Sequence, residues 1–281
     1  MSLSPFHGSP NVLFETRVRA VRRLSPGFVR LTLCGPSLDV FAPYGLDQRV
    51  KLLVPEDGYA AAFDFDGDVL PESQWRARWR ALPEAERPAM RSYTTSGIRP
   101  AAREVDVDFY VHARPGPASG WAARAREGER VLLSGPDVRR SDPSYGIQWS
   151  PGRADRFLLV GDETAFPAIR NIMSSLGPSA RVRAVLEVGD AADVAVMGEP
   201  RAGHEVTAHR RRDGSTGALT AAVDAWIAER GAEAAALGEG FYAWLATEST
   251  RVAGLRDRLR AAGVPPHRIH AQGYWHDRVR S

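Results

Sequence analysis

Cysteine and lysine are almost absent from this chain of 281 residues. Cys34 is the only cysteine, which excludes an internal disulfide, an all-cysteine iron–sulfur cluster and a structural zinc site of the common kinds. Redox chemistry in this chain therefore requires an organic cofactor. Lys51 is the only lysine. Arginine carries nearly all the positive charge, which we interpret as genomic base composition rather than selection for a basic surface.

Long apolar runs are missing as well. No stretch of about 18 apolar residues occurs, and the opening "MSLSPFHGSPNVLF" has no basic region followed by an apolar one. We therefore expect no membrane span, no signal peptide and a cytoplasmic location. The formal net charge of +3 is small and dispersed, so we expect no nucleic-acid partner. The histidines lack the pair spacing of a helical metal site, so we expect no bound metal.

The first half of the chain alternates apolar and polar residues with period two. The segments "TRVRAVRRL", "FVRLTLCG", "RVKLLVP", "EVDVDFYVHA" and "ERVLLSGP" predict half-buried strands separated by Gly, Pro and Asp. Short strands at this spacing predict an antiparallel β-barrel. Between Val54 and Met90 the alternation stops, and we expect a short helix at Glu72–Ala81 within this insertion.

The second half follows a different pattern, in which apolar runs alternate with helical segments. "RFLLVGDETAFPAIRNIMSSLG" and "GFYAWLATESTRVAGLRDRLRAAGV" each contain a strand, a turn and a helix, and "RVRAVLEVGD" is a further strand. This order predicts a parallel α/β sheet. We expect two domains, 1–150 and 151–281, joined within the Gly- and Pro-containing stretch 145–155.

The stretch "RSYTTSG", 91–97, groups residues that suit one edge of a flavin. Arg91 can pair with a phosphate oxygen, the Tyr93 ring can lie against an isoalloxazine, and Thr94 can hydrogen-bond near its reactive nitrogen. The alternative is an ordinary strand with an exposed arginine beside a buried tyrosine.

The segment "VHARPGPASGWAARAREG" predicts a strand, a turn and a helix that begins near Ala118 and Ser119. Free backbone N–H groups at such a helix start, among small residues, suit a pyrophosphate. A plain helix N-cap by Ser119 is the alternative.

Together these segments resemble the siderophore-interacting proteins, a family of FAD-dependent ferric-siderophore reductases within the ferredoxin-reductase superfamily. The resemblance spans nearly the whole chain. It depends on "HARPGPASGWAARAREGERVLLSGP", "VGDETAFPAI", "WRALPEAERPAMRSYTTS" and "VPPHRIHAQGYWHD". It implies a barrel that binds FAD and an α/β domain that binds NADPH or NADH. The family also suggests a monomer.

The resemblance assigns roles position by position. The residues that it places at FAD are Arg91, Ser92, Tyr93, Thr94, Val111, His112, Gly116, Pro117, Ala118, Ser119, Trp121, Asp162, Glu163, Thr164 and Ala165. The turn "GDETA", 161–165, could serve FAD's adenine side, the nicotinamide nucleotide or both; alternatively Asp162 or Thr164 merely caps a helix that has Pro167 in its first turn. Lys51 and His276 are placed at the substrate; alternatively, Lys51 is a strand lysine that points to solvent.

The choice of nicotinamide nucleotide stays open on the sequence alone. "HRRRDG", 209–214, could hold the 2′-phosphate of NADPH through Arg210, Arg211 and Arg212, or it could be a solvated loop. Glu187, at the end of the second strand, is the contrary signal for NADH. Thr247 and Glu248 complete the residues that we expect at this nucleotide.

Three positions depart from the family pattern. Ser96 stands where a second arginine is usual, Thr247 stands in the middle of the usual A-G-E, and His276 replaces the arginine of G-Y-W-R. Ser96 affects the contacts expected with FAD. Thr247 affects the use of a nicotinamide, and His276 affects the charge at the substrate.

The resemblance implies a ferric-siderophore reductase in which electrons pass from NAD(P)H through FAD to Fe(III), and Fe(II) is released. No protein nucleophile or acid–base pair is needed. Two alternatives remain: a flavin reductase that supplies electrons to a partner protein, and a flavin- or siderophore-binding protein with little turnover.

Overall fold

The protein divides into two compact units in a computed structural model that describes residues 9–54, 63, 65, 69–112, 114–140, 145–211 and 217–277. The first unit contains the chain up to Ile147 except Leu24–Pro26, and the second contains those three residues and the chain from Gln148 onward. The division lies within the stretch 145–155. Within the described residues, we find no helix with the length and apolar character needed to cross a membrane.

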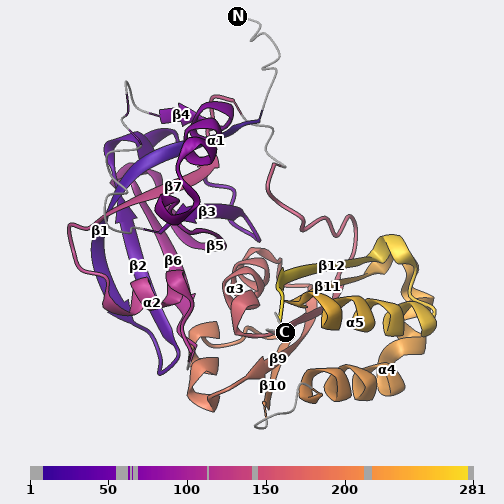
Figure 1. Cartoon of the computed structure of the whole chain (residues 1–281). Coiled ribbons are helices and arrows are strands. Elements are labelled where there is room, and N and C mark those ends of the chain that lie inside the picture. Colours follow the sequence, from indigo (N-terminus) through magenta and orange to yellow (C-terminus); the bar gives the residue numbers. More distant parts are fainter. Residues whose placement is uncertain are drawn as a thin grey trace, which may run out of the picture. The chain divides into compact units, whose positions relative to one another are not determined.

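The first unit is a closed antiparallel barrel of six strands (Figure 1). The strands are β1 (Asn11–Arg23), β2 (Phe28–Cys34), β3 (Arg49–Leu53), β5 (Met90–Arg99), β6 (Glu104–Tyr110) and β7 (Arg130–Pro136). Their order is β2-β6-β5-β3-β7-β1, and a β1–β2 pairing closes the ring. Closure leaves these strands without free edges, and it confirms the predicted barrel.

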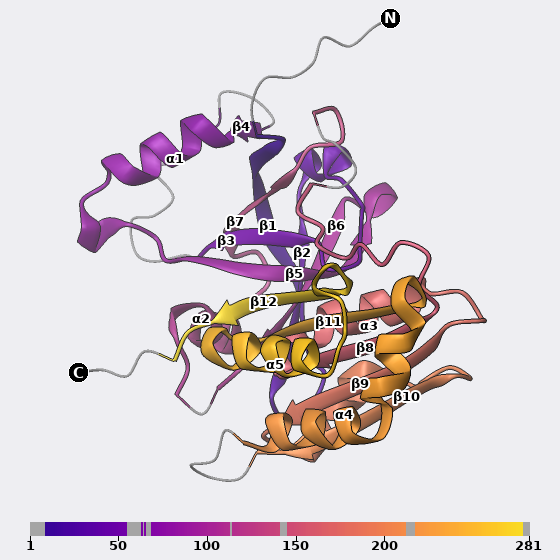
Figure 2. The same cartoon turned by 90° about the vertical axis from the view of Figure 1, so that its right-hand side faces the viewer.

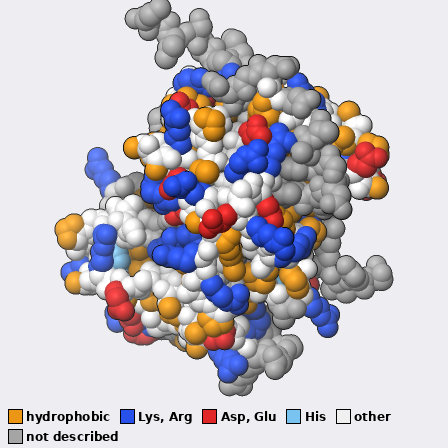
Figure 3. All heavy atoms as spheres, turned by 90° about the vertical axis from the view of Figure 1, so that its left-hand side faces the viewer, with side chains coloured by type: hydrophobic (Ala, Val, Ile, Leu, Met, Phe, Trp, Pro, Cys, Tyr) orange, Lys and Arg blue, Asp and Glu red, His pale blue; other side chains and the backbone are white. Residues whose placement is uncertain are grey.

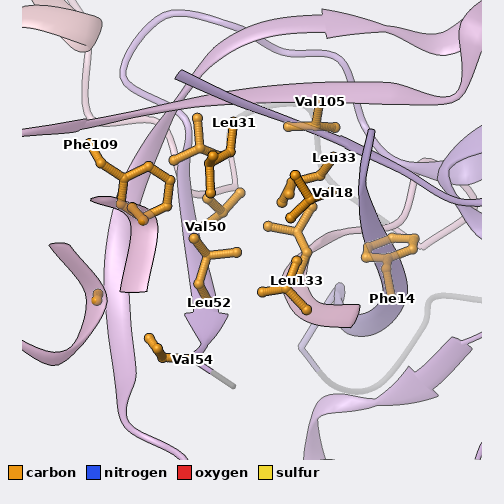
Figure 4. Close-up of a cluster of buried hydrophobic side chains, with 14 of the residues drawn as sticks. Phe14, Val18, Leu31, Leu33, Val50, Leu52, Val54, Val105, Phe109 and Leu133 are labelled. Atoms are coloured by element: carbon orange, nitrogen blue, oxygen red, sulfur yellow. The ribbon is translucent and has the colours of Figure 1, made fainter. Parts of the chain in front are cut away.

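The barrel interior is filled by the inward-facing residues of the predicted alternating segments. In Figure 4 side chains from several strands, including Leu31, Val50, Phe109 and Leu133, point toward one another. These four side chains are each 1% exposed or less. The period-two pattern therefore produces a single packed core.

The insertion between β3 and β5 builds a second, smaller core outside the barrel. It contains β4 (Val69–Pro71), which pairs with β1, and helix α1 (Glu72–Ala81), which is seen in Figure 2 and confirms the predicted helix. Trp75 is fully buried there against Leu13, Leu53 and Leu132, which face outward from the barrel strands. The insertion is thus anchored by apolar packing.

Arginine–carboxylate pairs cover the outer side of β2, β5 and β6. Arg30 donates to both oxygens of Asp108 at 2.6 and 2.9 Å, and Arg99 donates to both oxygens of Asp106 at 2.7 and 2.8 Å. Figure 3 shows basic and acidic side chains interspersed over the face that it presents. The charges of Arg30 and Arg99 are therefore neutralised locally.

The second unit is a parallel sheet of five strands with helices on both faces (Figures 1 and 2). Its strands are β8 (Arg156–Gly161), β9 (Arg181–Val188), β10 (His204–Arg210), β11 (Phe241–Glu248) and β12 (Ile269–Trp275). Helices α4 (Ala218–Leu237) and α5 (Ser249–Ala261) pack on one face, and α3 (Phe166–Ser175) lies on the other. This arrangement confirms the predicted α/β sheet.

The strand order β10-β9-β8-β11-β12 reverses between β8 and β11. In open α/β sheets ligands bind at such a switch point, outside the carboxyl ends of the strands. The turn after β8 and the end of β11 are therefore the positions in this unit where a nucleotide site is expected.

Gly161 allows the turn after β8 to pass close to its own helix. A Cβ atom at Gly161 would lie 2.5 Å from Ala165 Cβ and 3.0 Å from the Ala246 carbonyl oxygen. We therefore expect Gly161→Ala to lower the free energy of unfolding by about 1–3 kcal/mol, the usual cost of overpacking. A urea titration followed by circular dichroism measures this.

Gly254→Ala is the matched control, because Gly254 lies in α5 where an added Cβ atom would meet open space. Alanine has a higher helix propensity than glycine, so this variant should be as stable as the parent or up to about 1 kcal/mol more stable. A Gly161→Ala protein as stable as the parent would contradict the close approach.

Candidate functional site

Strand β5 presents the predicted flavin residues on both of its sides. It pairs with β3 so that Arg91 lies opposite Leu52, Ser92 opposite Lys51 and Tyr93 opposite Val50. Alternation places Arg91 and Tyr93 on the side of the core, whereas Ser92 and Thr94 lie on the outer side. Arg91 and Ser92 are exposed, Tyr93 is half-buried and Thr94 is buried.

Lys51 lies on the outer side of the barrel, next to Ser92. Its Nζ is 3.4 Å from Ser92 Oγ, and the cross-strand partner on the other side is Ser134. Burial lowers the pKa of Lys51, and the charges of Arg49 and Arg76 lower it further. The ammonium is therefore partly desolvated in cationic surroundings, which suits an anionic ligand.

Three aromatic rings connect β5 to the predicted pyrophosphate turn. The Tyr93 ring centroid is 4.5 Å from that of Phe109 in β6, which is 5.9 Å from that of Trp121 in α2 (Pro117–Arg124). Burial raises the pKa of Tyr93. Trp121 is 3% exposed and donates from Nε1 to Glu129 at 3.1 Å. Its ring is therefore fixed against the barrel core next to the start of α2.

The start of α2 is open. Gly116 is the N-cap residue, and among the described residues no side chain caps the helix. Ser119 lies in the first turn, where its hydroxyl is 3.4 Å from the Gly116 carbonyl oxygen, so the alternative of a Ser119 cap is wrong. The first N–H groups of a helix have no partner within it, and here Gly116 is exposed with open space around it. Such a turn suits an anion.

Val111 and His112 follow the end of β6 and precede this turn in the chain. The Val111 N–H donates to the Gly27 carbonyl oxygen at 2.8 Å. His112 is exposed and its ring meets that of Tyr110 edge-on at 4.7 Å. The structure therefore leaves the His112 ring accessible beside the turn.

In the second unit, Asp162 is the centre of the turn "GDETA". It is 1% exposed, and its Oδ1 accepts from the N–H and the hydroxyl of Thr164. Its Oδ2 accepts from Thr247 Oγ1 at 2.6 Å and from Trp275 Nε1 at 2.8 Å. Asp162 therefore caps the helical turn through Oδ1, as the alternative interpretation expected. Its Oδ2 connects the turn to the ends of β11 and β12.

Glu163 and Glu187 form a buried ion cluster with two arginines. Both carboxylates are 1% exposed or less. Arg211 donates to Glu163 Oε2 at 2.6 Å and to Glu187 Oε2 at 3.1 Å, while Arg251 donates to both oxygens of Glu187 at 3.0 and 2.8 Å. Burial opposes the charge of Arg211, but Glu163 and Glu187 outweigh it and raise its pKa.

Glu248 and Ser249 hold the end of β12. Glu248 Oε2 accepts from the N–H groups of Thr250 and Arg251 at 2.7 and 3.0 Å, as the N-cap of α5. Burial opposes ionisation of Glu248, but these backbone bonds outweigh it and lower the pKa of the carboxyl. Ser249 Oγ donates to the Trp275 carbonyl oxygen at 3.0 Å and lies 3.3 Å from His276 Nε2.

The structure thus groups the predicted residues in two sets. Arg91, Tyr93 and the start of α2 share one unit with Lys51. The GDETA turn, Glu187, Thr247, Glu248 and His276 share the carboxyl edge of the other unit. Arg210 is exposed at the end of β10, Ala165 is buried under its turn, and Arg212 lies outside the described residues.

The sequence analysis did not assign a site role to three residues at this edge, which are Arg251, Trp275 and Ser249. One signal was available for the first, because a carboxylate at the end of a buried strand requires a cation and Arg251 lies in the first turn of the last helix. Nothing in the spacing of the chain indicates the contacts of Trp275 or Ser249.

The barrel residues fit FAD. A pyrophosphate needs free N–H donors and a cation, which the open start of α2 and the exposed Arg91 supply, and a flavin needs an aromatic surface such as Tyr93. Ser96, at the position of the family's second arginine, accepts from the Asp108 N–H at 3.2 Å. The other arginine of this strand, Arg99, is paired with Asp106, so Arg91 is the cation of β5 that we expect at a phosphate.

Comparisons with known proteins agree with this geometry. Residues 17–140 match the model of the siderophore-interacting FAD-binding domain, and residues 154–278 match that of the siderophore-interacting protein. The NADPH-dependent ferric-chelate reductase of Escherichia coli (strain K12) is 30% identical over 93% of this chain and 92% of its own length. The chain belongs to the siderophore-interacting protein family.

Two further similarities bear on the extent of the match. An uncharacterised protein of Mycobacterium tuberculosis is 37% identical over 183 residues, which are 64% of this chain and 59% of that relative. The siderophore-interacting protein SipS from Aeromonas hydrophila has a TM-score of 0.70 at 26% identity, covering 96% of this chain and 94% of that one.

The fold is also that of ferredoxin reductases. The ferredoxin reductase of carbazole 1,9a-dioxygenase has a TM-score of 0.65 at 17% identity, covering 94% of this chain and 70% of that one. At this identity the likeness concerns the fold alone. The family nevertheless establishes an FAD-binding domain in the barrel.

Arg91→Ala should weaken FAD binding about tenfold to a hundredfold, because a charge-assisted contact contributes roughly 1.5–3 kcal/mol. The measurement is a titration of flavin-free protein with FAD, followed by quenching of flavin fluorescence. Arg22→Ala, an exposed arginine of β1, is the matched control and should bind like the parent. Equal affinity of Arg91→Ala and the parent would remove Arg91 from the site.

Proposed function

We propose that the protein is a ferric-siderophore reductase that passes electrons from NAD(P)H through FAD to siderophore-bound Fe(III) and releases Fe(II). When bound, FAD supplies the exchange between a two-electron hydride donor and a one-electron acceptor. Fe(II) is held far less tightly by hard oxygen ligands, so reduction releases the metal. A nicotinamide donor implies a cytoplasmic place of action.

One observation carries the proposal: the exposed Arg91 and the aromatic Tyr93 are linked through packed rings to an open, uncapped helix start. That arrangement supports an FAD site of Arg91, Ser92, Tyr93, Thr94 and the turn at Gly116. The remaining residues of this chain bind and orient. No side chain has to act as a nucleophile or transfer a proton.

The experiment uses purified protein with FAD, a ferric siderophore, NADPH or NADH, and a ferrous trap, under argon. Formation of the trapped Fe(II) at a rate that depends on both FAD and the nicotinamide supports the proposal. Flavin that is bleached by the nicotinamide without Fe(II) formation would favour a flavin reductase that serves a partner. Flavin that is never bleached would favour a binding protein.

Lys51 supports an anionic substrate. Ferric siderophores with catecholate ligands carry net negative charge, and Lys51 offers a partly desolvated ammonium next to Ser92. Arg76 of α1 also acts on Lys51, but it is paired with Glu72 at 2.6 Å, so Lys51 itself is the cation that we propose for the chelate. The pocket that we propose for the chelate therefore includes this side of β3.

The nicotinamide nucleotide that we propose is NADPH. Glu187, the residue that would favour NADH, has both oxygens bound by Arg251 and one also by Arg211. A carboxylate occupied in this way is a poor acceptor for ribose hydroxyls. Arg211 is also committed, which leaves the exposed Arg210 as the described cation best suited to a 2′-phosphate.

Lys51→Ala should raise the KM for an anionic ferric chelate about tenfold at low salt and leave a neutral chelate nearly unaffected. Added salt should narrow the difference, because it screens the attraction. Steady-state reduction with a ferrous trap measures both, and Arg80→Ala, an exposed cation of α1, is the control. A loss of equal size for the two chelates, or no loss, contradicts a pocket role.

Arg210→Gln should reduce the preference for NADPH over NADH at low salt, since a phosphate contact is lost. High salt should reduce the preference of the parent in the same direction. Anaerobic reduction of bound flavin by each nucleotide is the measurement, with Arg230→Gln on α4 as the exposed-cation control. Equal rates with both nucleotides at every ionic strength would exclude a phosphate role for Arg210.

A further inference from the structure

Three polar side chains form a row across the outer side of the barrel. The register places Lys51 of β3 directly opposite Ser92 of β5 on one side and opposite Ser134 of β7 on the other. Alternation puts them on the outer side, since the adjacent residues Val50 and Leu133 belong to the main barrel core. Side chains that are directly opposite in neighbouring strands have Cβ atoms about 4.5–5.5 Å apart. The Lys51 ammonium can therefore reach the hydroxyl on either side.

The Ser134 hydroxyl is buried without a hydrogen bond. Ser134 is 2% exposed, and its Oγ has no partner among the described residues. Its neighbour in β1, Leu13, is apolar and offers none. Trp75 packs in the same small outer core as Leu13, but its Nε1 is also unpaired within the described part of the chain, so it does not donate to Ser134. Such a buried hydroxyl is unfavourable unless a polar group reaches it.

The Lys51 ammonium has donors to spare. An ammonium carries three N–H donors, whereas the one hydrogen bond that Lys51 makes within the described ranges is to Ser92 Oγ, and it is long at 3.4 Å. Burial is the largest cause of the lowered pKa of Lys51, so solvent hydrates this ammonium less than that of a free lysine. An ammonium with few partners therefore lies next to an acceptor that has none.

We propose that Ser134 is a second hydrogen-bond acceptor for the Lys51 ammonium, so that this cation alternates between a retracted position at Ser134 and a forward position at Ser92. We also propose that an anionic ferric chelate selects the forward position. The inference deepens the proposed function, and its second part rests on it. Lys51 is the residue that contacts the chelate, and Ser134 is a positioning residue.

The two positions differ in their access to solvent. Ser92 is exposed, whereas Ser134 is buried, so an anion from solvent meets the ammonium only in the forward position. A ligand that binds one of two conformations better shifts the population toward it. The charged groups that act on Lys51 offer no third position. Arg49 and Arg76 are cations, and Glu72 is bound by Arg76 at 2.6 Å.

The test uses the single lysine as its own probe. FAD-loaded protein with carbon-13 only in lysine gives side-chain signals from Lys51 alone, and nuclear Overhauser effects from its Hε protons report which serine lies near. We expect effects to the Hβ protons of both Ser92 and Ser134 in the protein without chelate. An anionic gallium(III) tris-catecholate, which is redox-inert, should weaken the effect to Ser134 about twofold or more. A neutral gallium(III) tris-hydroxamate should not.

Variants separate this role from a structural one. Ser134→Ala removes the retracted position, so it should lower the KM for an anionic ferric chelate about twofold, because the competent fraction of an evenly divided population doubles. The kcat and the KM for a neutral chelate should stay unchanged. Ser134→Thr retains the hydroxyl in a residue that suits strands and should behave like the parent. Ser175→Ala, which removes a hydroxyl of α3, is the control.

The opposing results are equally definite. Effects from Lys51 to one serine alone would overturn the alternation, whatever the variants do. Effects to both serines that the anionic chelate leaves unchanged would overturn the selection by substrate. A KM that changes in Ser134→Ala by the same factor for both chelates would reduce Ser134 to a structural residue. Iron reduction with Lys51 fixed at Ser92 would overturn the inference and leave the proposed function standing, whereas two lysine positions without iron reduction would overturn the reductase alone.

Discussion

Two buried carboxylates and the two arginines that bind them hold the carboxyl edge of the parallel sheet together. Glu163, Glu187, Arg211 and Arg251 come from the turn after β8, the end of β9, the end of β10 and the start of α5. Glu163 also accepts from the Gly189 N–H and Glu187 from that of Leu219 at the start of α4. Removing Glu187 would leave Arg251 without its carboxylate partner, and breaking a buried pair costs about 3–5 kcal/mol. The loops at this edge of the sheet therefore share one support.

The barrel solves a related problem with apolar groups. A cofactor surface has to stay open, yet the residues that form it must not move. Here the rings of Tyr93, Phe109 and Trp121 pack in series beneath the surface, and Phe109 belongs to the main core. Arg91 and the start of α2 are exposed above this support. Pre-organised binding requires polar groups that are accessible to the ligand and are fixed by packed side chains behind them.

Periodicity was sufficient to predict the barrel and the parallel sheet, because burial of one face or both decides local structure there. The helix Glu72–Ala81 was predicted from the length of the insertion that contains it. The nearness of Arg91, Tyr93 and the α2 turn followed from the family resemblance. The pairing of Glu187 with Arg211 and Arg251 was not predicted, because it joins residues that are 24 and 64 positions apart in the chain. Thr247 was expected to affect the use of a nicotinamide. The bond from its hydroxyl to Asp162 was not predicted, because only the packing of neighbouring strands reveals it.

A chain with a single lysine can be labelled at one lysine side chain. The ammonium of Lys51 is half-buried, and its lowered pKa increases the fraction that is an uncharged amine near neutral pH. Amines react with acylating reagents only in that uncharged form, so Lys51 is the one lysine side chain of this sequence at which such a reagent can react. A small label attached there would lie between Ser92 and Ser134. A spectroscopic reporter could thus be introduced at the outer face of β3 without any substitution in the chain.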